Sequence, residues 1–431
     1  MREAWPVATL GELADRGGGA VRTGPFGSQL HRADYVSGSD GVPVVMPKDM
    51  SGGYIDYSTV AMISHQKAAE LRQHIAAPGD ILLARRGEIG RCALIKEDDA
   101  GILCGTGCIR ISVQGSAVIP TFLHRFLLAP QTASRLEGMA VGATMANLNA
   151  GIVRSLAVPV PPTGKQIRIA AILAAYDDLI ENNTRRIQIL EEMAQAIYRE
   201  WFVEFRFPGH EDVRMVDSEL GPIPEGGQVR PIGDVVRTLG GGTPSKAVPA
   251  YWTDGSFTWF TPSDLTKSAS MFVERSGARI TPLGLSRSSA TAFPARSVMM
   301  TSRATIGVVS ITTVEAATNQ GFIICVPNER MREYHLYFWL LSNVELFSAL
   351  ASGATFKEIS RSKFRPIALA VAPIDVESRF HDMVSPIGEL ILNLQRNNAN
   401  LRDTRDLLLP GLISGEIDVS GLDVGHSEPA A

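Results

Sequence analysis

Apolar side chains recur at alternating intervals of three and four residues in two long stretches of the chain. In the first stretch the repeating positions, which include one asparagine, are Tyr176, Ile180, Asn183, Ile187, Leu190, Ala194, Ile197 and Trp201. The same register returns 211 residues later, with one asparagine and one arginine, at Ile387, Ile391, Leu394, Asn398, Leu401, Arg405 and Leu408. Because this heptad period is the signature of helices that pair along a seam, it predicts two long coiled-coil helices.

An open alternative is that two unrelated surface helices pack on their own domains, but the shared register favours pairing. "PVPPTG" precedes the first helix, expected from Gln166 to Trp201, and Pro410 is expected to end the second. About 36 residues of helix would extend roughly 54 Å. A buried asparagine in each helix, Asn183 and Asn398, would fix register or direction at some cost in stability. Antiparallel packing would place two equivalent blocks at opposite ends.

The sequence around these helices is duplicated. "VPVVMPKDM" (42–50) corresponds to "FTWFTPSDL" (257–265), and "PGDILLARRGEIGRCALI" (78–95) corresponds to "PARSVMMTSRATIGVVSI" (294–311). Both blocks are rich in Gly, Pro and short β-branched runs, with a short helix expected at "PTFLHRFLL" and "LYFWLLSN". We therefore predict an α+β fold with a pseudo-two-fold internal repeat, in which two similar mixed α/β domains are separated by two long antiparallel coiled-coil helices.

A "GAT" element, at 142–144 and again at 353–355, lies where each block passes into its helix, and from there the offset holds at 211. Gly142 and Gly353 are expected to permit a tight turn. The residues expected to cap that turn or, as the less favoured alternative, to contact a phosphate are Thr144, Thr355, Asn147, Asn149 and Ser360.

Charge is distributed unevenly along the 431 residues, whose formal net charge is −4. Residues 1–165 carry a net +2 and residues 227–375 a net +5, whereas the segments 166–210, 211–226 and 376–431 carry −2, −4 and −5. Two positive blocks separated by acidic segments point weakly to two surfaces that meet a polyanion.

Neither a membrane nor a metal is expected from the composition. No apolar run is long enough to span a bilayer, and "MREAWPVATLGEL" lacks the features of a secretory signal, so we expect a cytoplasmic protein. The few, unevenly placed cysteines fit a reducing compartment. Cys104 and Cys108 have no second pair or histidine cluster nearby, so they are not expected to bind metal.

Catalytic motifs are missing from both copies of the repeat. "PPTGKQ" lacks the leading Gly and the Ser or Thr of a phosphate loop, and "GGGAVRTG" lacks the strand-to-helix setting of a dinucleotide site. There is no G-x-S-x-G elbow, no H-E-x-x-H pair and no Asp/Asn-Pro-Pro-Tyr/Phe tetrapeptide of the amino-methyltransferase type. The chain is therefore predicted to recognise a ligand rather than to catalyse a reaction.

The order of motifs resembles that of a known family over nearly the whole chain. The motifs are "GPFGSQL" (24–30), "GGGTPSK" with "YWTDGSFTW" (240–259), the twin 78–95 and 294–311 segments, the twin GAT elements and "KQIRIAAILAAYDDLIENNTRRIQILEEMAQAIYREWF". Together they resemble the DNA-specificity subunit of type I restriction–modification systems. The resemblance implies a non-catalytic subunit whose two target-recognition domains each read one half of an asymmetric bipartite DNA target.

The resemblance also implies partners and a domain order. Two methyltransferase subunits would bind the helices and their junctions with the recognition domains, and restriction/translocase subunits would join the full complex. S-adenosylmethionine and ATP would bind those partners, with no cofactor in this chain. The expected divisions are recognition domains at 1–165 and 229–375, helices at 166–207 and 376–410, a linker at 208–228 and a C-terminal tail at 411–431.

A DNA reader needs phosphate contacts for affinity and base-edge contacts for sequence, from residues in variable loops. Arg suits guanine, Gln suits adenine and Lys suits phosphates. On that basis the candidate DNA-binding residues of the first block are Ser28, Gln29, Lys48, Arg85, Arg86 and Arg91, and those of the second are Lys246, Ser263, Lys267, Ser302, Arg303 and Lys357. For each, a solvated surface side chain is the open alternative. Two rival functions also stay open: an assembly scaffold that does not bind DNA, and an enzyme whose site forms at an interface.

Overall fold

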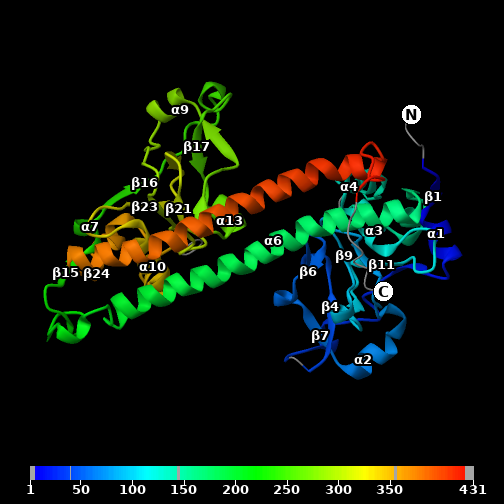
Figure 1. The fold of residues 1–431 in the computed structure, drawn as a ribbon, viewed down its shortest axis with the longest axis horizontal. Helices are drawn as coiled ribbons and strands as arrows, with labels where there is room; N and C mark the ends of the chain where they lie inside the picture. Colours follow the sequence, from blue (N-terminus) through cyan, green and yellow to red (C-terminus); the bar gives the residue numbers. More distant parts are fainter. Residues whose placement is uncertain (1–4, 39, 143–145, 354–356, 423–431) are drawn as a thin grey trace. The chain divides into compact units, whose positions relative to one another are not determined.

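The computed structural model describes residues 5–38, 40–142, 146–353 and 357–422. The chain divides into two compact units, of which unit 1 comprises residues 1–181 and 399–431 and unit 2 comprises residues 182–398. Two long helices pass through this division. Helix α6 (Thr163–Tyr198) begins in unit 1 and ends in unit 2, whereas α13 (Ile374–Ser414) begins in unit 2 and ends in unit 1 (Figure 1). Each unit is therefore an α/β domain completed by one end of both long helices.

Unit 1 is built on two four-stranded sheets. The first has the antiparallel order β2 (Ala20–Thr23), β11 (Cys108–Ser112), β8 (Ile81–Ala84) and β9 (Cys92–Leu94). The second has the order β10 (Leu103–Cys104), β4 (Val42–Val45), β7 (Ala61–Ile63) and β3 (Tyr35–Val36), with β10 and β4 parallel. Two-stranded pairs join β1 (Val7–Thr9) to β12 (Ala157–Pro159) and β5 (Met50–Ser51) to β6 (Tyr54–Ile55).

Short helices cover these sheets: α1 (Leu10–Arg16), α2 (His65–Glu70), α3 (Pro120–Leu128), α4 (Pro130–Met139) and α5 (Ala150–Arg154), with 3-10 turns η1 (Arg32–Asp34), η2 (Pro47–Asp49), η3 (Tyr57–Thr59), η4 (Arg72–His74) and η5 (Glu97–Asp99). Local sequence explains their ends. Thr9 and Glu12 form a reciprocal capping box at the start of α1, with bonds of 3.2 and 2.9 Å. Pro120 and Pro130 stand at the first positions of α3 and α4, where a missing N–H costs nothing.

Unit 2 repeats this plan with one strand more in its main sheet and one strand fewer in its second sheet. Its main sheet has the order β16 (Arg237–Gly240), β23 (Phe322–Val326), β20 (Val298–Thr301), β21 (Val309–Thr312) and β18 (Phe272–Val273). The second sheet has the order β19 (Ala278–Ile280), β17 (Phe257–Phe260) and β22 (Ala316–Thr318), with β17 and β22 parallel. The remaining pairs are β15 (Gln228–Pro231) with β24 (Ala368–Val371) and β13 (Met215–Val216) with β14 (Ile223–Pro224).

The helices of unit 2 are α7 (Ile232–Val235), α8 (Pro262–Ser268), α9 (Pro282–Ser286), α10 (Glu333–Ser342), α11 (Val344–Leu350) and α12 (Arg361–Phe364), with the π-turn η6 (Arg199–Val203) and the 3-10 turns η7 (His210–Asp212) and η8 (Pro249–Tyr251). The order β2–β11–β8–β9 matches β16–β23–β20–β21, and the order β10–β4–β7 matches β22–β17–β19. The predicted duplication of one mixed α/β fold is confirmed, as are the short helices at α3 and α10.

The predicted helical seam is confirmed within each unit. None of the fifteen seam positions is exposed. In unit 2 the amide of Asn183 donates to Oδ1 of Asn398 at 3.0 Å, and further along α6 Tyr198 meets Phe380, which lies earlier in α13. In unit 1 Arg405 of α13 lies 2.5 Å from Asp177 of α6. The two helix segments are antiparallel in unit 2, and Leu409, Leu412 and Ile413 share the core of unit 1 with Ile169 and Leu173.

The predicted end of the second helix at Pro410 is wrong, because α13 continues to Ser414. The last turn buries Leu412 and Ile413 in the core of unit 1, and this burial outweighs the one backbone hydrogen bond that the proline removes. Gly415, with φ of 76°, terminates the helix in the left-handed conformation that glycine adopts readily.

Candidate nucleic-acid interface

In unit 1 the turn between β8 and β9 carries the loop that contains Gly142. The carbonyl of Arg85 accepts from the N–H of Leu148 at 2.8 Å, and its Nε donates to Oδ1 of Asn147 at 3.1 Å. Arg86 and Asn147 form an antiparallel bridge. Arg85 is 8% exposed, so its side chain holds the loop in place instead of facing solvent. Arg86, the next residue, is exposed.

Unit 2 contains the same junction with other side chains. The carbonyl of Ser302 accepts from the N–H of Ile359 at 3.0 Å, and Arg303 and Glu358 form the equivalent bridge. Arg303 also donates to both carboxylate oxygens of Glu358, at 3.1 and 2.9 Å. Ser302 is 2% exposed and lies inside this junction. Arg85 and Ser302 are thus buried counterparts, and neither is available to a ligand at the surface.

Three more segments gather beside this turn in each unit: one bonds to the turn directly, and the other two pack against that segment. A Cβ atom at Gly107 would lie 2.7 Å from Cδ of Pro47 and 4.0 Å from Cγ of Arg86, which places η2 beside the β8–β9 turn. In unit 2 a Cβ atom at Gly321 would lie 2.7 Å from Cγ of Pro262, and the carbonyl of Gly321 accepts from the N–H of Ser302 at 2.9 Å. The remaining segment follows β2 in unit 1, at residues 24–29, and β16 in unit 2, at residues 241–246.

These segments define two equivalent surfaces. Loop face 1 consists of the described residues within 24–29, 47–49, 85–91, 105–107 and 141–149. Loop face 2 consists of the described residues within 241–246, 262–268, 302–307, 319–321 and 352–360. Backbone bonds tie the first segment of each face to its neighbour, from Gly24 to the carbonyl of Cys108 at 2.9 Å and from Gly242 to the carbonyl of Thr318 at 2.8 Å. Segments far apart in sequence therefore converge in the same way twice.

The predicted residues of loop face 1 differ in how freely they face solvent. Ser28 is exposed, while Gln29 is partly buried and accepts from the N–H of Phe26 at 3.1 Å. The side chain of Lys48 is 62% exposed, pairs with Asp49 at 2.9 Å and donates to the carbonyl of Thr59 at 2.7 Å. Arg91 is partly buried and pairs with Glu88.

In loop face 2 the predicted cations are more accessible. Lys246, Lys267 and Lys357 are exposed, and the side chain of Arg303 is 48% exposed despite its pairing with Glu358. Ser263 is exposed and shares a 2.8 Å hydrogen bond with Thr261.

Two residues of these faces were missed from the sequence. Phe26 is 60% exposed on loop face 1. Gln320 is exposed on loop face 2, where its Oε1 accepts from Thr243 at 2.8 Å. The pairing of "GTGC" with "NQGF" in the repeat was the signal for Gln320, because it places an amide in the second face where the first face has a threonine.

The GAT elements occupy a fixed place in both faces. Gly142 and Gly353 have φ of 134° and 131°, which confirms that each needs a conformation typical of glycine. The side chain of Asn149 caps α5 and that of Ser360 caps α12, accepting from backbone N–H groups at 2.9 and 3.3 Å. These bonds cap the short helices that follow and not the GAT turn itself, so capping of that turn stays a prediction, and Thr144 and Thr355 lie outside the described residues.

The described residues contain no group of three or more His, Cys, Asp or Glu side chains arranged to hold a metal ion. Burial raises the pKa of Cys104 to about 12 and that of Cys108 well above its usual value. Within the same described ranges, no helix combines the length and apolar character needed to cross a membrane.

Comparison with known proteins fits this duplicated arrangement. The family model "Type I restriction modification DNA specificity domain" matches twice, at residues 5–192 and 224–400. The chain is 24% identical over 427 residues to the MjaIX specificity subunit of Methanocaldococcus jannaschii, covering 97% of this chain and 94% of that one. It is 25% identical over 400 residues to the HindI specificity subunit of Haemophilus influenzae, covering 79% and 86%.

Among solved structures, the S subunit of a type I restriction–modification system from M. genitalium has the same fold, with a TM-score of 0.55 at 12% identity and coverage of 95% of this chain and 96% of that one. The family model covers most of the chain, once in each half, and matches the internal repeat. The chain therefore belongs to the type I restriction–modification DNA-specificity family and is a specificity subunit, not a catalytic one.

Proposed function

We propose that loop face 1 and loop face 2 each read one half of an asymmetric bipartite DNA target for a type I restriction–modification complex. One observation carries this proposal: the two faces share a backbone arrangement but differ in side chains at equivalent positions. Lys48 corresponds to Ser263, Gln29 to Lys246 and Asn147 to Glu358. A common scaffold with different donors and acceptors is what reading two different half-sites requires.

The exposed cations suit contacts with phosphates and guanine. Lys246, Lys267 and Lys357 of loop face 2 would bind phosphates, and so would Lys48 of loop face 1. Arg86 and Arg303 present guanidinium groups that match the two acceptors of guanine in the major groove. Glu358 holds Arg303 in one geometry, which reduces the conformational entropy lost on binding. Arg85 and Ser302 do not belong to this set because they are buried.

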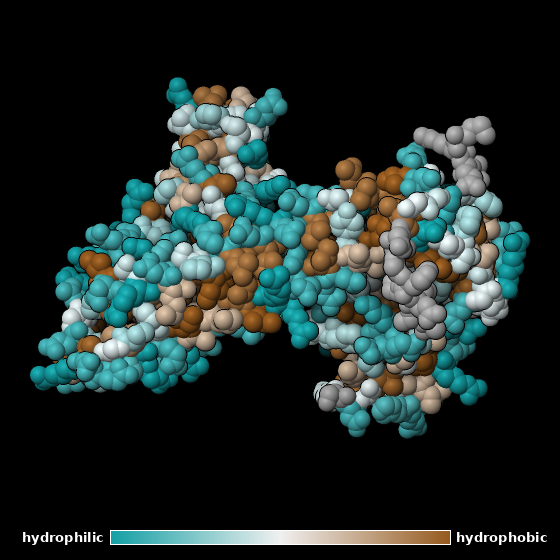
Figure 2. Space-filling view, in the orientation of Figure 1, coloured by the Kyte–Doolittle hydropathy of each residue, from teal (hydrophilic) through white to brown (hydrophobic). Residues whose placement is uncertain are grey.

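The long helices are the proposed docking surface for two methyltransferase subunits. On α6 of unit 2, Ile189 and Met193 are 49% and 50% exposed and lie one turn apart on the same side of the helix. Figure 2 shows hydrophobic side chains gathered at the surface over the stretch where α6 and α13 run side by side. Exposed apolar surface of this kind marks protein–protein contact. S-adenosylmethionine and ATP would then bind the partner subunits, including the restriction/translocase subunits of the full complex.

DNA binding is tested by the salt dependence of duplex affinity for the assembled complex. Replacing Lys357 by Ala should weaken binding to all sequences and reduce the slope of log affinity against log salt by about 1. Arg330→Ala is the matched control, since Arg330 is also an exposed cation of unit 2 but lies outside loop face 2. An assembly scaffold without DNA binding would show no salt-dependent duplex affinity at all. Methyl transfer by the purified chain without partners would instead favour an enzyme.

The helices are also the proposed spacer between half-sites. Insertion of four residues into α6 should change the preferred gap between the half-sites, measured by sequencing methylated sites. The matched control inserts the same four residues into the linker at 208–228, which is not part of either helix and should leave the gap unchanged. An unchanged gap after the helix insertion would contradict the spacer role.

A further inference from the structure

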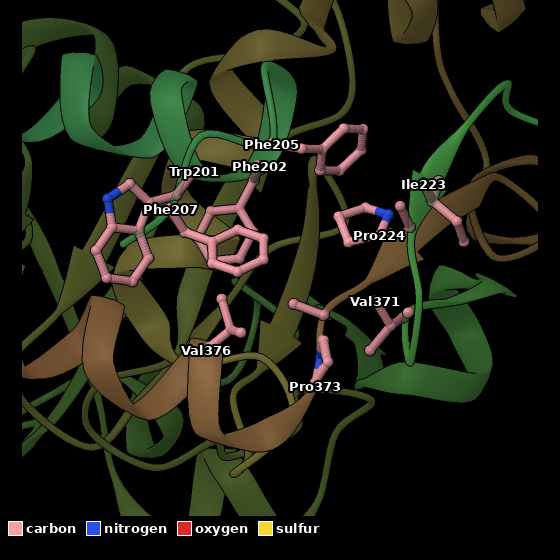
Figure 3. A pocket seen from close by; sticks show the side chains of 12 residues that line it. Trp201, Phe202, Phe205, Phe207, Ile223, Pro224, Val371, Pro373 and Val376 are labelled. Carbon is pink, nitrogen blue, oxygen red and sulfur yellow. The ribbon is translucent and has the colours of Figure 1, made fainter. Parts of the chain in front are cut away.

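Two regions of unit 2 differ in what they offer a ligand. At the end of α6 the rings of Trp201, Phe202 and Phe207 lie together (Figure 3). The cavity that these rings and their neighbours leave is about 20 Å³, which has room for about one water molecule. This region therefore stabilises the unit by packing. On loop face 2, by contrast, the amide of Gln320 is exposed and can reach a ligand.

The amide of Gln320 has a fixed orientation. Its Oε1 accepts a hydrogen bond from the hydroxyl of Thr243, a partly buried residue, at 2.8 Å. This bond uses one of the two lone pairs of Oε1. Among the described residues, Nε2 of Gln320 has no hydrogen-bond partner. The side chain therefore presents one free acceptor site and two donors to solvent.

The backbone that carries this pair of side chains is held tightly. The N–H of Gly321 donates to Oδ1 of Asn319 at 2.9 Å, which forms an Asx turn with Gln320 at its centre. A Cβ atom at Gly241 would lie 1.9 Å from the carbonyl oxygen of Asn319, so the segment that contains Thr243 packs directly on the segment that contains Gln320. An amide fixed in this way loses little conformational entropy when it binds.

Gln320 also lies beside the arginine that is proposed to contact guanine. The carbonyl of Gly321 accepts from the N–H of Ser302 at 2.9 Å. Gln320 precedes one partner of this bond by one residue, and Arg303 follows the other by one residue. Both side chains have a hydrogen-bond partner on the face that orients them. Loop face 2 therefore has two oriented polar side chains in adjacent segments.

Unit 1 repeats the backbone of this site without the amide. The carbonyl of Gly107 accepts from the β8–β9 turn at 2.9 Å, as its counterpart in unit 2 does. By the offsets of the repeat, Thr106 stands in place of Gln320, and the exposed Phe26 stands in place of Thr243. Unit 1 therefore has neither the amide nor the hydroxyl that orients it at this position.

We propose that Gln320 reads an adenine in the half-site of unit 2, through the major groove. The inference rests on the proposed reading of DNA by loop face 2 and names the base. Oε1 accepts from the N6 amino group of adenine while Nε2 donates to N7, a pair of bonds that distinguishes adenine from the other bases. Thr243 is a positioning residue, because it holds Oε1 and does not touch the base. Unit 1 reads its half-site without this contact.

The first test removes the amide within the assembled complex. Sequencing of the methylated sites gives the target of the wild type. Gln320→Thr, which introduces the residue of unit 1, should reduce the preference for adenine at one position of the unit 2 half-site by roughly tenfold and leave the other half unchanged. Gln228→Thr is the matched control, since Gln228 is an exposed glutamine of unit 2 outside loop face 2, and it should change no preference.

Base analogues test the two hydrogen bonds separately, with duplex affinity as the measurement. At the adenine whose preference is lost, 7-deazaadenine removes the N7 acceptor and purine removes the N6 amino group. Each analogue should weaken binding by the wild type and have little effect on binding by Gln320→Thr. Thr243→Val keeps the shape of the side chain but removes its hydroxyl, so it should reduce the preference for adenine less than Gln320→Thr does.

The outcomes separate this inference from the proposed function. If the wild type methylates a bipartite target and Gln320→Thr keeps the same base preferences, this inference alone is overturned. It is also overturned if the position that loses its preference is not an adenine. If the wild-type complex shows no sequence-specific methylation, the proposed reading of DNA fails, and this inference fails with it.

Discussion

Units 1 and 2 share a fold but stabilise the same helix contact by opposite means. In unit 1 Asp177 of α6, 4% exposed, accepts from Arg125 of α3 and Arg405 of α13. By the offsets of the repeat, Asp177 corresponds to Gly388 in unit 2, Arg125 to Phe338 and Arg405 to Ala194. Phe338 and Ala194 are 2% and 1% exposed and belong to the apolar core. A buried charge cluster in one copy is thus replaced by close packing in the other.

The comparison teaches that the fold requires a filled helix contact but not a charged one. The space that the Asp177 side chain takes in unit 1 is occupied in unit 2 by the ring of Tyr334, since a Cβ at Gly388 would lie 2.3 Å from the Tyr334 hydroxyl. Burying charges costs solvation energy that only full pairing offsets, whereas apolar packing has no such requirement. Unit 1 should therefore be sensitive to the loss of any one member of the cluster.

Breaking the charge cluster should reduce stability more than any other change considered below. Arg405→Ala leaves the buried carboxylate of Asp177 with only Arg125 and the hydroxyl of Tyr54 as partners, and should lower the free energy of unfolding of unit 1 by about 3 kcal/mol. Hydrogen exchange measured by mass spectrometry separates the two units, and protection should fall in unit 1 only.

A triple variant converts unit 1 toward the solution of unit 2. Arg125→Phe, Asp177→Ala and Arg405→Ala together remove every charge, so more than half of the stability lost in Arg405→Ala should return. If the triple variant is less stable than the single one, the interchangeability of charge and packing at this contact is contradicted.

The second effect concerns a buried histidine. Burial, with a smaller contribution from the nearby Arg125, lowers the pKa of His124 to about 3, whereas the unfolded chain has its usual value near 6.5. The unfolded state therefore binds the proton first as the pH falls, so stability is complete above about pH 6.5 and is lost progressively down to about pH 3. At pH 5 the loss should reach about 2 kcal/mol in unit 1.

Unit 2 supplies the matched substitution, because Tyr337 is the counterpart of His124 in α10. His124→Tyr should reduce the pH dependence of unit 1 between pH 7 and 5. It should not abolish it, since burial also lowers the pKa of His74 in the same unit. Hydrogen exchange of peptides from unit 1, measured by mass spectrometry at pH 7 and pH 5 and corrected for the intrinsic pH dependence of exchange, follows the stability of this unit. An unchanged pH dependence would show that His124 does not titrate on unfolding.

The smallest change in stability is expected from exchanging alanine and glycine at one equivalent position of the two loop faces. Ala304 of unit 2 has φ of 62°, where its counterpart in unit 1 is Gly87 with φ of 78°. An alanine in the left-handed conformation is strained by about 1 kcal/mol. Glycine removes this strain, but it also gives the unfolded chain more conformational freedom, which offsets part of the gain in stability. Ala304→Gly should stabilise unit 2 by roughly 0.5 kcal/mol, and Gly87→Ala should destabilise unit 1 by about 1 kcal/mol. Chemical denaturation of the two variants checks both signs, and equal signs would contradict the comparison.

The sequence predicted the features that repeat along the chain. The seam from Tyr176 to Trp201 and its copy could be found because a heptad period and a constant offset are local properties of the sequence. The direction of pairing followed from the equivalence of the two blocks, and the exposed cations Arg86 and Lys357 followed from their position in the most variable segments.

What the sequence did not predict depends on contacts between distant segments. Arg85 and Ser302 follow buried strands and turn inward to meet a loop about 60 residues later, so residue type alone indicated a surface position. The charge at seam position Arg405 had no explanation until Asp177 and Arg125 lay beside it. Similarly, Pro410 is a helix terminator by local rules, yet the burial of Leu412 carries α13 past it.

Each unit is proposed to read its own half-site. The most direct test replaces residues 227–375 with the corresponding block of another family member and sequences the methylated sites produced by the assembled complex. One half of the target should change, while the other half, read by loop face 1, stays the same. A target in which both halves change would contradict independent reading by two units.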